Sequence, residues 1–585
     1  MDQSLPKAFS FALHRFFGAF ERLEPIVEWT VLIGPEYFLE RYIVSSRAQV
    51  FLTMMLACYP FGLIMHLLPY GRIRHAYSFV VGSFLLQSCW GIHWIHTPVT
   101  CLISYAMLRL CPRDKVQQVV PTFVMFYLGM AHFQHQYTVT NVLGLDIYFT
   151  ASHMILTQKI YMLAYNLHDG YLISTKKKEK MDCDTGRKQE NDPTKSKADQ
   201  EAEEALKAAQ SCAQYALSEC PSLLEFLGYT FCFSNVLVGP SYEYSYYRSA
   251  CDGSNLYITK VNKNDGTTTR VLRGKQIPSN ILPTLGPLFK AFLMISFASI
   301  FDRACNYRRL LTPWFHNLTA KQKHFYNWLT NFINRFKVYF TWCFAEGSNN
   351  IWYAGFNGYD EDGNSQGFTI SRGADILQLE TCESIKVGTK AWNTKTSQWL
   401  LKYVYIRNKN RLGIVYAVSA IWHGFFPGYY MLAVIIWLMS QCERLGRRKI
   451  SPYFSPKKWS FYGVSYIVVL HSLGSYATTA FFLRSAENVM DNWRSHNYWG
   501  HIVLVLYYVI VSQFPDPPQH VVASCQAEKK ALAQQGAKLE LPQTSPHKSM
   551  SGRLGTATID TMMMRTPPKD PARVRFTDET KYHDS

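Results

Sequence analysis

The stretch AQVFLTMMLACYPFGLIMHLLP, residues 48–69, decides the fold class. It contains no Lys, Arg, Asp or Glu, and it is long enough for a helix to cross a hydrocarbon layer about 30 Å thick. Arg72 and Arg74 follow it directly, as basic residues do on the cytosolic side of a spanning helix. The stretch therefore predicts a transmembrane helix.

Further apolar runs occupy most of the remaining chain. Their approximate ranges are 76–95, 97–111, 117–133, 141–166, 223–240, 281–303, 326–345, 396–407, 411–425, 427–442, 459–483 and 498–514. Several of these runs are short or carry His, Asn and Gln, so some can be tilted or re-entrant, with their polar groups satisfied by neighbouring helices. We predict an all-α polytopic membrane protein with roughly nine to twelve membrane-embedded helices.

Charge and cysteine usage exclude other classes of protein. The 585 residues include 60 Lys plus Arg against 42 Asp plus Glu, a formal net charge of +18. The basic residues edge the hydrophobic runs instead of forming one stripe, which argues against nucleic-acid binding and favours anionic headgroups and anionic soluble substrates as partners. The 14 cysteines stand singly with no CxxC pair, so we expect neither a disulfide framework nor a metal site.

Composition divides the chain into five parts. The first part alternates phenylalanine with charged residues, as an amphipathic interfacial helix does, and two polar parts lack large apolar clusters, which predicts disorder. Within the polar loop a helix is suggested near 199–217. The parts are an interfacial segment 1–47, N-terminal transmembrane helices 48–173, a flexible polar loop 174–210, a core with the C-terminal transmembrane helices 211–525, and a disordered cytosolic tail 526–585.

The densest polar groups within the apolar body lie in two segments of the second half. These segments are AWNTKTSQWL, residues 391–400, and SAIWHGFFPGYY, residues 419–430. A polar or ionisable side chain in a membrane segment costs about 2–4 kcal/mol on insertion scales. The cost of placing Asn393 and His423 in such segments suggests that each has a role that offsets it, so each is a candidate functional residue.

Spacing gives these two residues a testable geometry. If 396–407 and 411–423 are helices that turn at 408–410, Asn393 and His423 are equally far along the chain from position 408. At 1.5 Å per residue each would lie about 22 Å from the turn, at the same end of a helical hairpin. Such a hairpin would bring the two residues to a similar depth in the membrane.

Structural interpretations of the same residues stay open. A histidine in an apolar segment is more often a structural hydrogen-bonding residue than a catalyst, and this chain has 18 histidines. Asn393 is also a candidate N-cap for the helix that follows it. The aromatic residues around His423 are equally typical of an interfacial belt.

Four segments in order carry a resemblance to a known family. SAIWHGFFPGYY closely resembles the WHGxxPGYY signature of the membrane-bound O-acyltransferase family, in its lysophospholipid acyltransferase branch, and WNTKTSQWL, residues 392–400, is similar to the WN-x-x-T-x-x-WL element of that branch. YFTWCFAEGSNNIWYAGFNGY, residues 339–359, is similar to its aromatic run that leads to Glu-Gly and then to a loop rich in Gly and Phe. NVLVGPSYEY, residues 235–244, looks more weakly like its VGP segment.

The resemblance implies a fold, a reaction and two catalytic residues. It implies membrane-embedded helices that enclose a tunnel, a catalytic core within 211–525, and transfer of an acyl group from acyl-CoA to the free hydroxyl of a lysophospholipid, for phospholipid remodelling in the endoplasmic reticulum membrane. Acyl-CoA would be a cosubstrate, with no permanently bound cofactor. His423 would take the hydroxyl proton, and Asn393 would donate to the developing oxyanion or orient the hydroxyl.

Further binding residues are expected around these two. Glu346 can orient a headgroup or a neighbouring polar side chain, or cap a helix. The residues expected to line the acyl and lipid channels, with core packing as an almost equal alternative, are Trp342, Trp392, Trp422 and Tyr429. The basic residues positioned to bind the phosphates of acyl-CoA, with anchoring at the membrane edge as an equal alternative, are Lys402, Arg407, Lys409 and Arg411.

Three other functions remain as alternatives. A member of the same family can acylate another lipid alcohol or a protein serine. A transporter would use His423 and Asn393 to line a substrate path, and we would then expect inverted hydropathy repeats, which the sequence does not display. Retention of both residues argues against a catalytically dead scaffold. The headgroup, the acyl chain and the oligomeric state are left open at this point.

Overall fold

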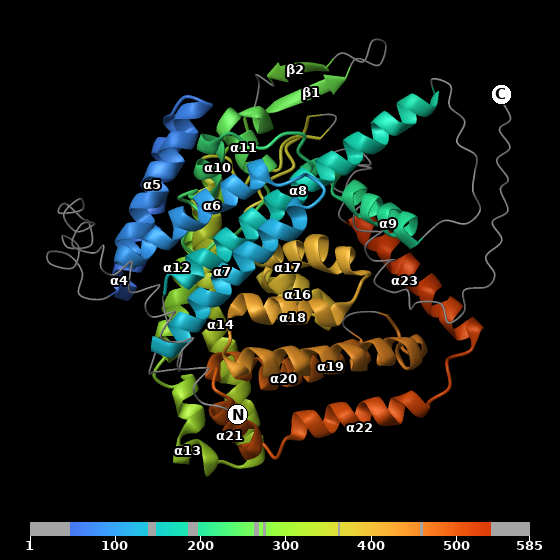
Figure 1. Cartoon of the computed structure of the whole chain (residues 1–585). Coiled ribbons are helices and arrows are strands. Elements are labelled where there is room, and N and C mark those ends of the chain that lie inside the picture. The colour runs from blue at the N-terminus through green and yellow to red at the C-terminus, as the bar shows by residue number, and fades with distance from the viewer. Residues whose placement is uncertain are drawn as a thin grey trace, which may run out of the picture. The chain divides into compact units, whose positions relative to one another are not determined.

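The computed structural model describes residues 47–138, 148–184, 197–261, 268–272, 277–360, 363–456 and 460–539. Within these ranges almost all of the regular structure is helical (Figure 1), which confirms the predicted class of helical membrane protein. Residues 541–585 separate from the rest of the chain as a second unit. That unit and residues 1–46 of the expected interfacial segment lie outside the described residues.

The first half of the chain contains long helices and one hairpin. Its helices are α4 Arg47–Leu67, α5 Arg72–Trp90, α6 His96–Leu110, α7 Val116–Thr138, α8 Thr150–Asp184, α9 Lys197–Ser211, α10 Leu223–Thr230, α11 Tyr244–Asp252 and α12 Ile281–Phe301. Strands β1 Tyr257–Val261 and β2 Thr268–Leu272 pair antiparallel, with Thr259 opposite Arg270. This small hairpin, coloured green in Figure 1, was not predicted.

The second half is helical in all of its named elements. They are α13 Pro313–His316, α14 Ala320–Asn350, α15 Ile376–Glu380, α16 Ile385–Trp392, α17 Thr394–Leu400, α18 Leu412–His423, α19 Pro427–Lys449, α20 Phe461–Leu483, α21 Ala486–Ser495, α22 Trp499–Gln513 and α23 Gln519–Leu539. A π-helical turn, Leu401–Tyr405, and a 3₁₀ turn, Ile406–Asn408, continue α17.

Three helical stretches in the described ranges are both long and apolar enough to cross a membrane. They are Ala48–Leu67, Ile281–Phe301 and Gly463–Leu483, and the shorter helices α18 and α22 are also apolar. Other predicted spans are helical but place polar side chains inside the protein, for example Gln158 and Asn166 of α8. The number of membrane-embedded helices, nine to twelve, therefore stays a prediction.

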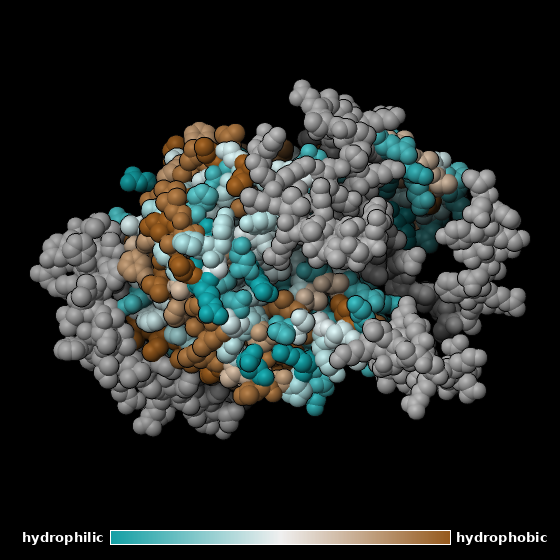
Figure 2. All heavy atoms as spheres, turned by 90° about the horizontal axis from the view of Figure 1, so that it is seen from above, coloured by the Kyte–Doolittle hydropathy of each residue, from teal (hydrophilic) through white to brown (hydrophobic). Residues whose placement is uncertain are grey.

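The outer surface of the helices suits a lipid environment. Only 17% of the most apolar window of α12 is buried, and α22 exposes large apolar residues such as Ile502, Leu506 and Ile510. Figure 2 shows hydrophobic residues, in brown, gathered into broad patches on the described surface. Apolar patches of this extent are typical of contact with a membrane or a partner.

The predicted helix over 223–240 is wrong in its second half. Helix α10 ends at Thr230, and an irregular buried loop follows. Gly239 has a φ of +80°, and Pro240 has no N–H for a helical hydrogen bond. The loop is held instead by side chains, since the buried Lys159 Nζ donates to the carbonyl of Tyr229 at 2.9 Å and to Asn235 Oδ1 at 2.6 Å.

Two segments that were expected to lack structure are partly helical. The segment 174–210, predicted as a flexible loop, supplies the end of α8 and nearly all of α9; the suggested helix near 199–217 corresponds to α9. Residues 526–539 of the predicted disordered tail belong to α23. Both segments are rich in Ala, Lys, Glu and Gln, which have high helix propensity. Polar composition by itself does not separate a solvated helix from a disordered segment.

Candidate active site

His423 occupies a helix end that the neighbouring residues create. Helix α18 ends at this residue, and Gly424 follows with a φ of +120° and a ψ of −168°, a conformation that is essentially restricted to glycine. The Gly424 N–H still reaches the carbonyls of Ala420 and Ile421. Pro427 then begins α19, where its fixed φ is favourable. The helix is therefore broken directly after the histidine.

The imidazole of His423 lies half-buried among aromatic rings. Its centroid is 4.7 Å from the ring of Trp422, 5.8 Å from Tyr429 and 5.0 Å from Phe481 of α20. Two of the predicted aromatic residues, Trp422 and Tyr429, thus surround the histidine. Among the described residues its ring nitrogens have no hydrogen-bond partner, so both remain available to a substrate.

Asn393 caps the helix that follows it. It lies between α16 and α17, and its Oδ1 accepts a hydrogen bond from the Thr396 N–H at 3.2 Å. The capping interpretation of this residue is therefore confirmed. The cap uses only the carbonyl oxygen, and in the described part of the chain the Nδ2 group has no protein acceptor. Capping is consequently compatible with donation from Nδ2 to a substrate oxygen.

The predicted hairpin between these two residues is present. Lys409 and Asn410 have φ values of +52° and +59°, and this left-handed pair reverses the chain between the 3₁₀ turn and α18. Trp399 and Trp422 bring the two arms together, with ring centroids 5.9 Å apart. No hydrogen bond or ring contact joins Asn393 to His423 within the described ranges.

The motif over 339–359 lies against the segment that carries Asn393. Trp342 of α14 contacts Trp392 edge to face, with centroids 5.0 Å apart, so two more of the predicted aromatic residues are neighbours. One turn further along α14, Glu346 is mostly buried, and its Oε1 lies 3.8 Å from Nε of Arg372. Thr394 fixes the start of α17, because its N–H donates to the carbonyl of Gly373 at 2.8 Å.

A relay of polar side chains connects Asn393 to the VGP segment. Gln158 of α8 donates from Nε2 to Thr396 Oγ1 at 2.9 Å, and Ser241 Oγ donates to Gln158 Oε1. Because the backbone of Thr396 holds Asn393, this relay ties the candidate oxyanion donor to α8. Sequence reasoning did not identify Gln158 or Ser241, although Ser241 directly follows the VGP residues.

The same segment also contacts the motif over 339–359. The Oδ1 atom of Asn349 accepts hydrogen bonds from Ser234 Oγ at 2.7 Å and from Tyr242 Oη at 3.0 Å. Asn349 Nδ2 returns a hydrogen bond to the carbonyl of Ser234 at 3.0 Å. The VGP segment is therefore hydrogen-bonded to the motif over 339–359 and, through Gln158, to the segment that carries Asn393.

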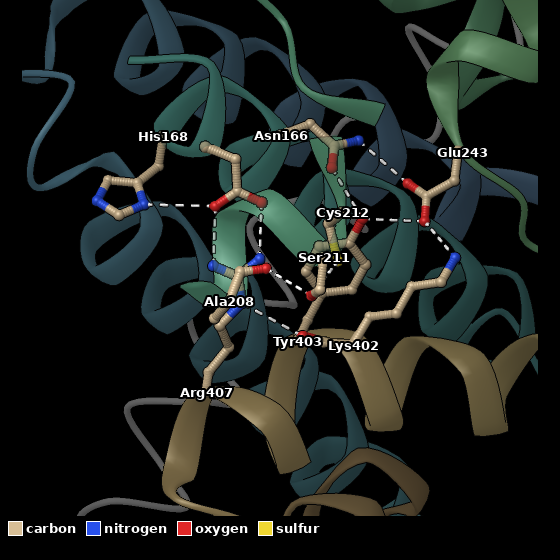
Figure 3. Close-up of polar contacts among 10 residues, drawn as sticks. Asn166, His168, Ala208, Ser211, Cys212, Glu243, Lys402, Tyr403 and Arg407 are labelled. Carbon is tan, nitrogen blue, oxygen red and sulfur yellow. Dashed lines mark hydrogen bonds and ion pairs between the residues drawn. The ribbon is translucent and has the colours of Figure 1, made fainter. Parts of the chain in front are cut away.

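Glu243 is the centre of a second buried group of polar side chains (Figure 3). Its Oε1 accepts hydrogen bonds from Tyr403 Oη at 2.9 Å and from Lys402 Nζ at 3.2 Å, and its Oε2 accepts from Asn166 Nδ2 at 3.1 Å. Tyr403 Oη also lies 2.8 Å from Asn166 Oδ1, so its single hydroxyl proton is shared between the two acceptors. Lys402, predicted to contact acyl-CoA, is thus already paired with a buried carboxylate.

Arg407 is paired in the same way. Its guanidinium forms a bidentate ion pair with Asp169 of α8, with N–O distances of 2.8 and 2.6 Å, and the two side chains are only 8% and 0% exposed. Lys409 and Arg411 are exposed, and Lys409 Nζ lies 3.4 Å from Glu204 of α9. The four predicted phosphate-binding residues therefore divide into two that pair with buried carboxylates and two that are exposed.

Comparison with known proteins identifies the family of this chain. The matching family description, MBOAT, membrane-bound O-acyltransferase family, covers residues 135–485. A Drosophila melanogaster protein named lysophospholipid acyltransferase 6 is 29% identical over 451 residues, which cover 76% of this chain and 57% of that protein. The human membrane-bound glycerophospholipid O-acyltransferase 2 is 27% identical over 451 residues, covering 75% of this chain and 79% of that protein.

A more distant relative gives the same result. The Schizosaccharomyces pombe lysophospholipid acyltransferase is 25% identical over 490 residues, covering 80% of this chain and 87% of that protein. The family match spans more than half of the chain and includes Asn393, His423 and the buried polar clusters described above. The chain belongs to the membrane-bound O-acyltransferase family and is an O-acyltransferase embedded in a membrane.

Proposed function

We propose that this enzyme transfers a fatty acyl group from acyl-CoA to the free hydroxyl of a lysophospholipid, and that it remodels phospholipids in the endoplasmic reticulum membrane. The acceptor class follows the names of the relatives, which are lysophospholipid and glycerophospholipid O-acyltransferases. The observation that carries the proposal is the half-buried imidazole of His423, placed at a helix break, surrounded by aromatic rings and without a protein hydrogen-bond partner among the described residues.

In this proposal His423 acts as general base. A neutral ring nitrogen takes the proton of the lysophospholipid hydroxyl while that oxygen attacks the thioester carbonyl. The tetrahedral intermediate then collapses, the carbon–sulfur bond breaks, and the imidazolium returns the proton to the leaving thiolate of CoA. One ester forms, one thioester breaks, and no acyl-enzyme intermediate is required. The segment GNSQG, residues 363–367, matches the GxSxG pattern, but it lies in a loop with isolated β-bridges and not between a strand and a helix, so it does not form a nucleophile elbow.

Asn393 supplies a hydrogen bond to the reacting oxygen atoms. Its Nδ2 group is free among the described residues while Oδ1 is fixed by Thr396, so the amide is oriented before substrate binds. A preoriented donor aimed at a developing oxyanion stabilises the transition state more than a mobile one. Donation to the attacking hydroxyl is the alternative use of the same group.

The aromatic residues form the apolar surroundings of the acyl chain and the lipid. Trp422 and Tyr429 lie beside His423, whereas Trp342 and Trp392 lie beside Asn393. These rings exclude water, which would otherwise compete with the lysophospholipid for the thioester. We assign to Glu346, which faces Arg372, the orientation of the polar headgroup or of that arginine.

The phosphates of acyl-CoA need accessible cations. Lys409 and Arg411 at the turn of the hairpin are exposed, and we propose that they make the phosphate contacts. Lys402 and Arg407 would have to exchange buried carboxylate partners to do so, which carries a desolvation penalty. We therefore propose that these two residues stabilise the hairpin through their carboxylate partners and do not bind the cosubstrate directly.

The test is acyl transfer by purified full-length protein. Wild type, His423→Ala and Asn393→Ala receive oleoyl-CoA or arachidonoyl-CoA with lysophospholipids carrying choline, ethanolamine, serine or inositol, and diacyl product is measured by mass spectrometry. We expect product from wild type with at least one headgroup and almost none from folded His423→Ala. If no lysophospholipid is acylated while another lipid alcohol or a peptide serine is, the acceptor assignment is wrong.

A further inference from the structure

His132 of α7 contacts the backbone of the residue before the candidate base. Its Nε2 lies 3.0 Å from the carbonyl oxygen of Trp422, so Nε2 carries a proton and donates. The side chain is buried, with 7% of its surface exposed. The carbonyl it reaches belongs to the last turn of α18, where backbone acceptors lack helical partners. His132 therefore caps the C-terminus of the helix that ends at His423.

The face of α7 that carries His132 also contacts the residues that follow the helix break. A Cβ on Gly424 would lie 3.1 Å from Cγ and Nδ1 of His132, and a Cβ on Gly129 would lie 3.4 Å from the ring of Phe425. His135 approaches Phe426 edge to face, with centroids 6.4 Å apart. Residues three apart lie on one side of a helix, so this face of α7 supports the broken turn.

Trp422 is consequently fixed from three directions. His132 holds its carbonyl, Met154 of α8 accepts the indole N–H at 3.0 Å, and Trp399 contacts its ring. The peptide that leads into His423 cannot shift without breaking one of these contacts. The His423 side chain itself is held only by ring contacts among the described residues, so its position depends on the backbone that carries it.

We propose that His132 is a positioning residue for acyl transfer, which places the imidazole of His423 by donating a hydrogen bond to the Trp422 carbonyl. This inference rests on the proposed role of His423 as base. Displacement of a catalytic group by about 1 Å from a change outside the reacting atoms can cost about 10²-fold in rate. Loss of the hydrogen bond is therefore expected to lower kcat and to leave substrate binding nearly unchanged.

The test compares substitutions that separate the hydrogen bond from ring packing. His132→Phe keeps a ring of similar size and removes the donor, whereas His132→Gln keeps an N–H donor near the position of Nε2. For His132→Phe we expect kcat to fall about 10–100-fold with KM for acyl-CoA and lysophospholipid within about twofold, and for His132→Gln we expect kcat within about threefold of wild type.

A matched control is His153→Gln on α8. His153 is also a buried histidine, and in the described part of the chain its ring contacts Thr100, Tyr127 and Phe149 and forms no hydrogen bond or ring contact with α18. We expect this control to retain wild-type kcat. Monodisperse elution in detergent and the apparent melting temperature report folding of every variant, and His423→Ala is assayed in parallel.

The outcomes separate this inference from the proposed function. Wild-type kcat in folded His132→Phe, or equal losses of kcat in His132→Phe and His132→Gln, would overturn the positioning role of His132. An inactive His423→Ala would in that case still support His423 as the general base. Full activity in His423→Ala would show that His423 is not the general base, and the positioning role of His132 would then lose its basis. If His132→Phe does not fold, the result for His132→Gln decides, because a large loss of kcat there contradicts the proposal.

Discussion

Replacement of Arg407 by methionine is expected to destabilise the fold strongly without a matching effect on acyl-CoA binding. The guanidinium makes two hydrogen bonds of 2.8 and 2.6 Å to Asp169 in a site where both side chains are almost fully buried. Its Nε also donates to the carbonyl of Lys402 at 3.3 Å within the turns after α17, so the pair with Asp169 ties these turns to α8. Removal of Arg407 leaves a buried carboxylate without its main partner.

The expected magnitude follows from this geometry. Two unit charges about 4 Å apart attract by about 4 kcal/mol at an effective dielectric constant of 20. Removal of one partner from a buried pair typically costs about 3–5 kcal/mol, because the remaining charge is uncompensated, whereas replacement of both partners by apolar residues is often neutral. Arg407→Met and Asp169→Leu should therefore each lower stability more than the double variant does.

The assay is thermal unfolding of purified variants in detergent, followed by tryptophan fluorescence. Arg411→Met is the control for stability, since Arg411 is an exposed arginine on the same hairpin. We expect the order wild type, double variant, single variants from highest to lowest melting temperature. Melting of Arg407→Met together with wild type, accompanied by a raised KM for acyl-CoA, would show that Arg407 binds the cosubstrate and would refute this reasoning.

Three further perturbations test other parts of the structure. Gly424→Ala should lower kcat and destabilise the protein by about 1–3 kcal/mol, since a side chain at this φ is strained and its Cβ would lie 3.1 Å from His132; wild-type melting temperature and kcat would contradict this. Gln158→Leu should lower kcat more than it raises KM, because the support of Asn393 through Thr396 is lost; an unchanged kcat would show that the relay is dispensable. Burial alone would raise the pKa of the Glu380 carboxyl, but hydrogen bonds from Arg335 and Tyr339 and the Arg335 charge lower it. The ionised Glu380 carboxyl therefore stabilises the fold above its unfolded pKa of about 4.3, and this stabilisation is lost as pH falls through the lower pKa of the folded state. The difference in melting temperature between wild type and Glu380→Gln should therefore close in acid. A difference that does not change with pH would contradict the ion pair.

Sequence reasoning located the helices because hydropathy and helix breakers act locally. The apolar run over 48–69, for example, predicts a structure that neighbouring residues alone determine. The error over 223–240 has the opposite cause, since a buried irregular loop is as apolar as a helix and is stabilised by distant groups such as Lys159. Helix α23 was missed as an ordered segment because its composition is polar, and for the same reason α9 was suggested only as a helix within a flexible loop.

Only the residues of the candidate site that lie within the sequence motifs could be predicted. His423, Asn393 and their aromatic neighbours were found because they belong to short segments. The residues that support them come from other helices, and no local pattern connects Gln158 or His132 to those segments. The pairing of Lys402 and Arg407 with buried carboxylates likewise depends on tertiary contacts, which spacing along the sequence does not reveal.

The central claim is that the imidazole at the broken end of α18 deprotonates the acceptor hydroxyl. The most direct measurement is the single-turnover rate of acyl transfer by His423→Gln, with saturating acyl-CoA and the lysophospholipid preferred by wild type. We predict a rate about 10²–10⁴-fold below wild type, the range expected for loss of a general base, with acyl-CoA binding retained. A folded His423→Gln enzyme with a single-turnover rate close to that of wild type would contradict the claim.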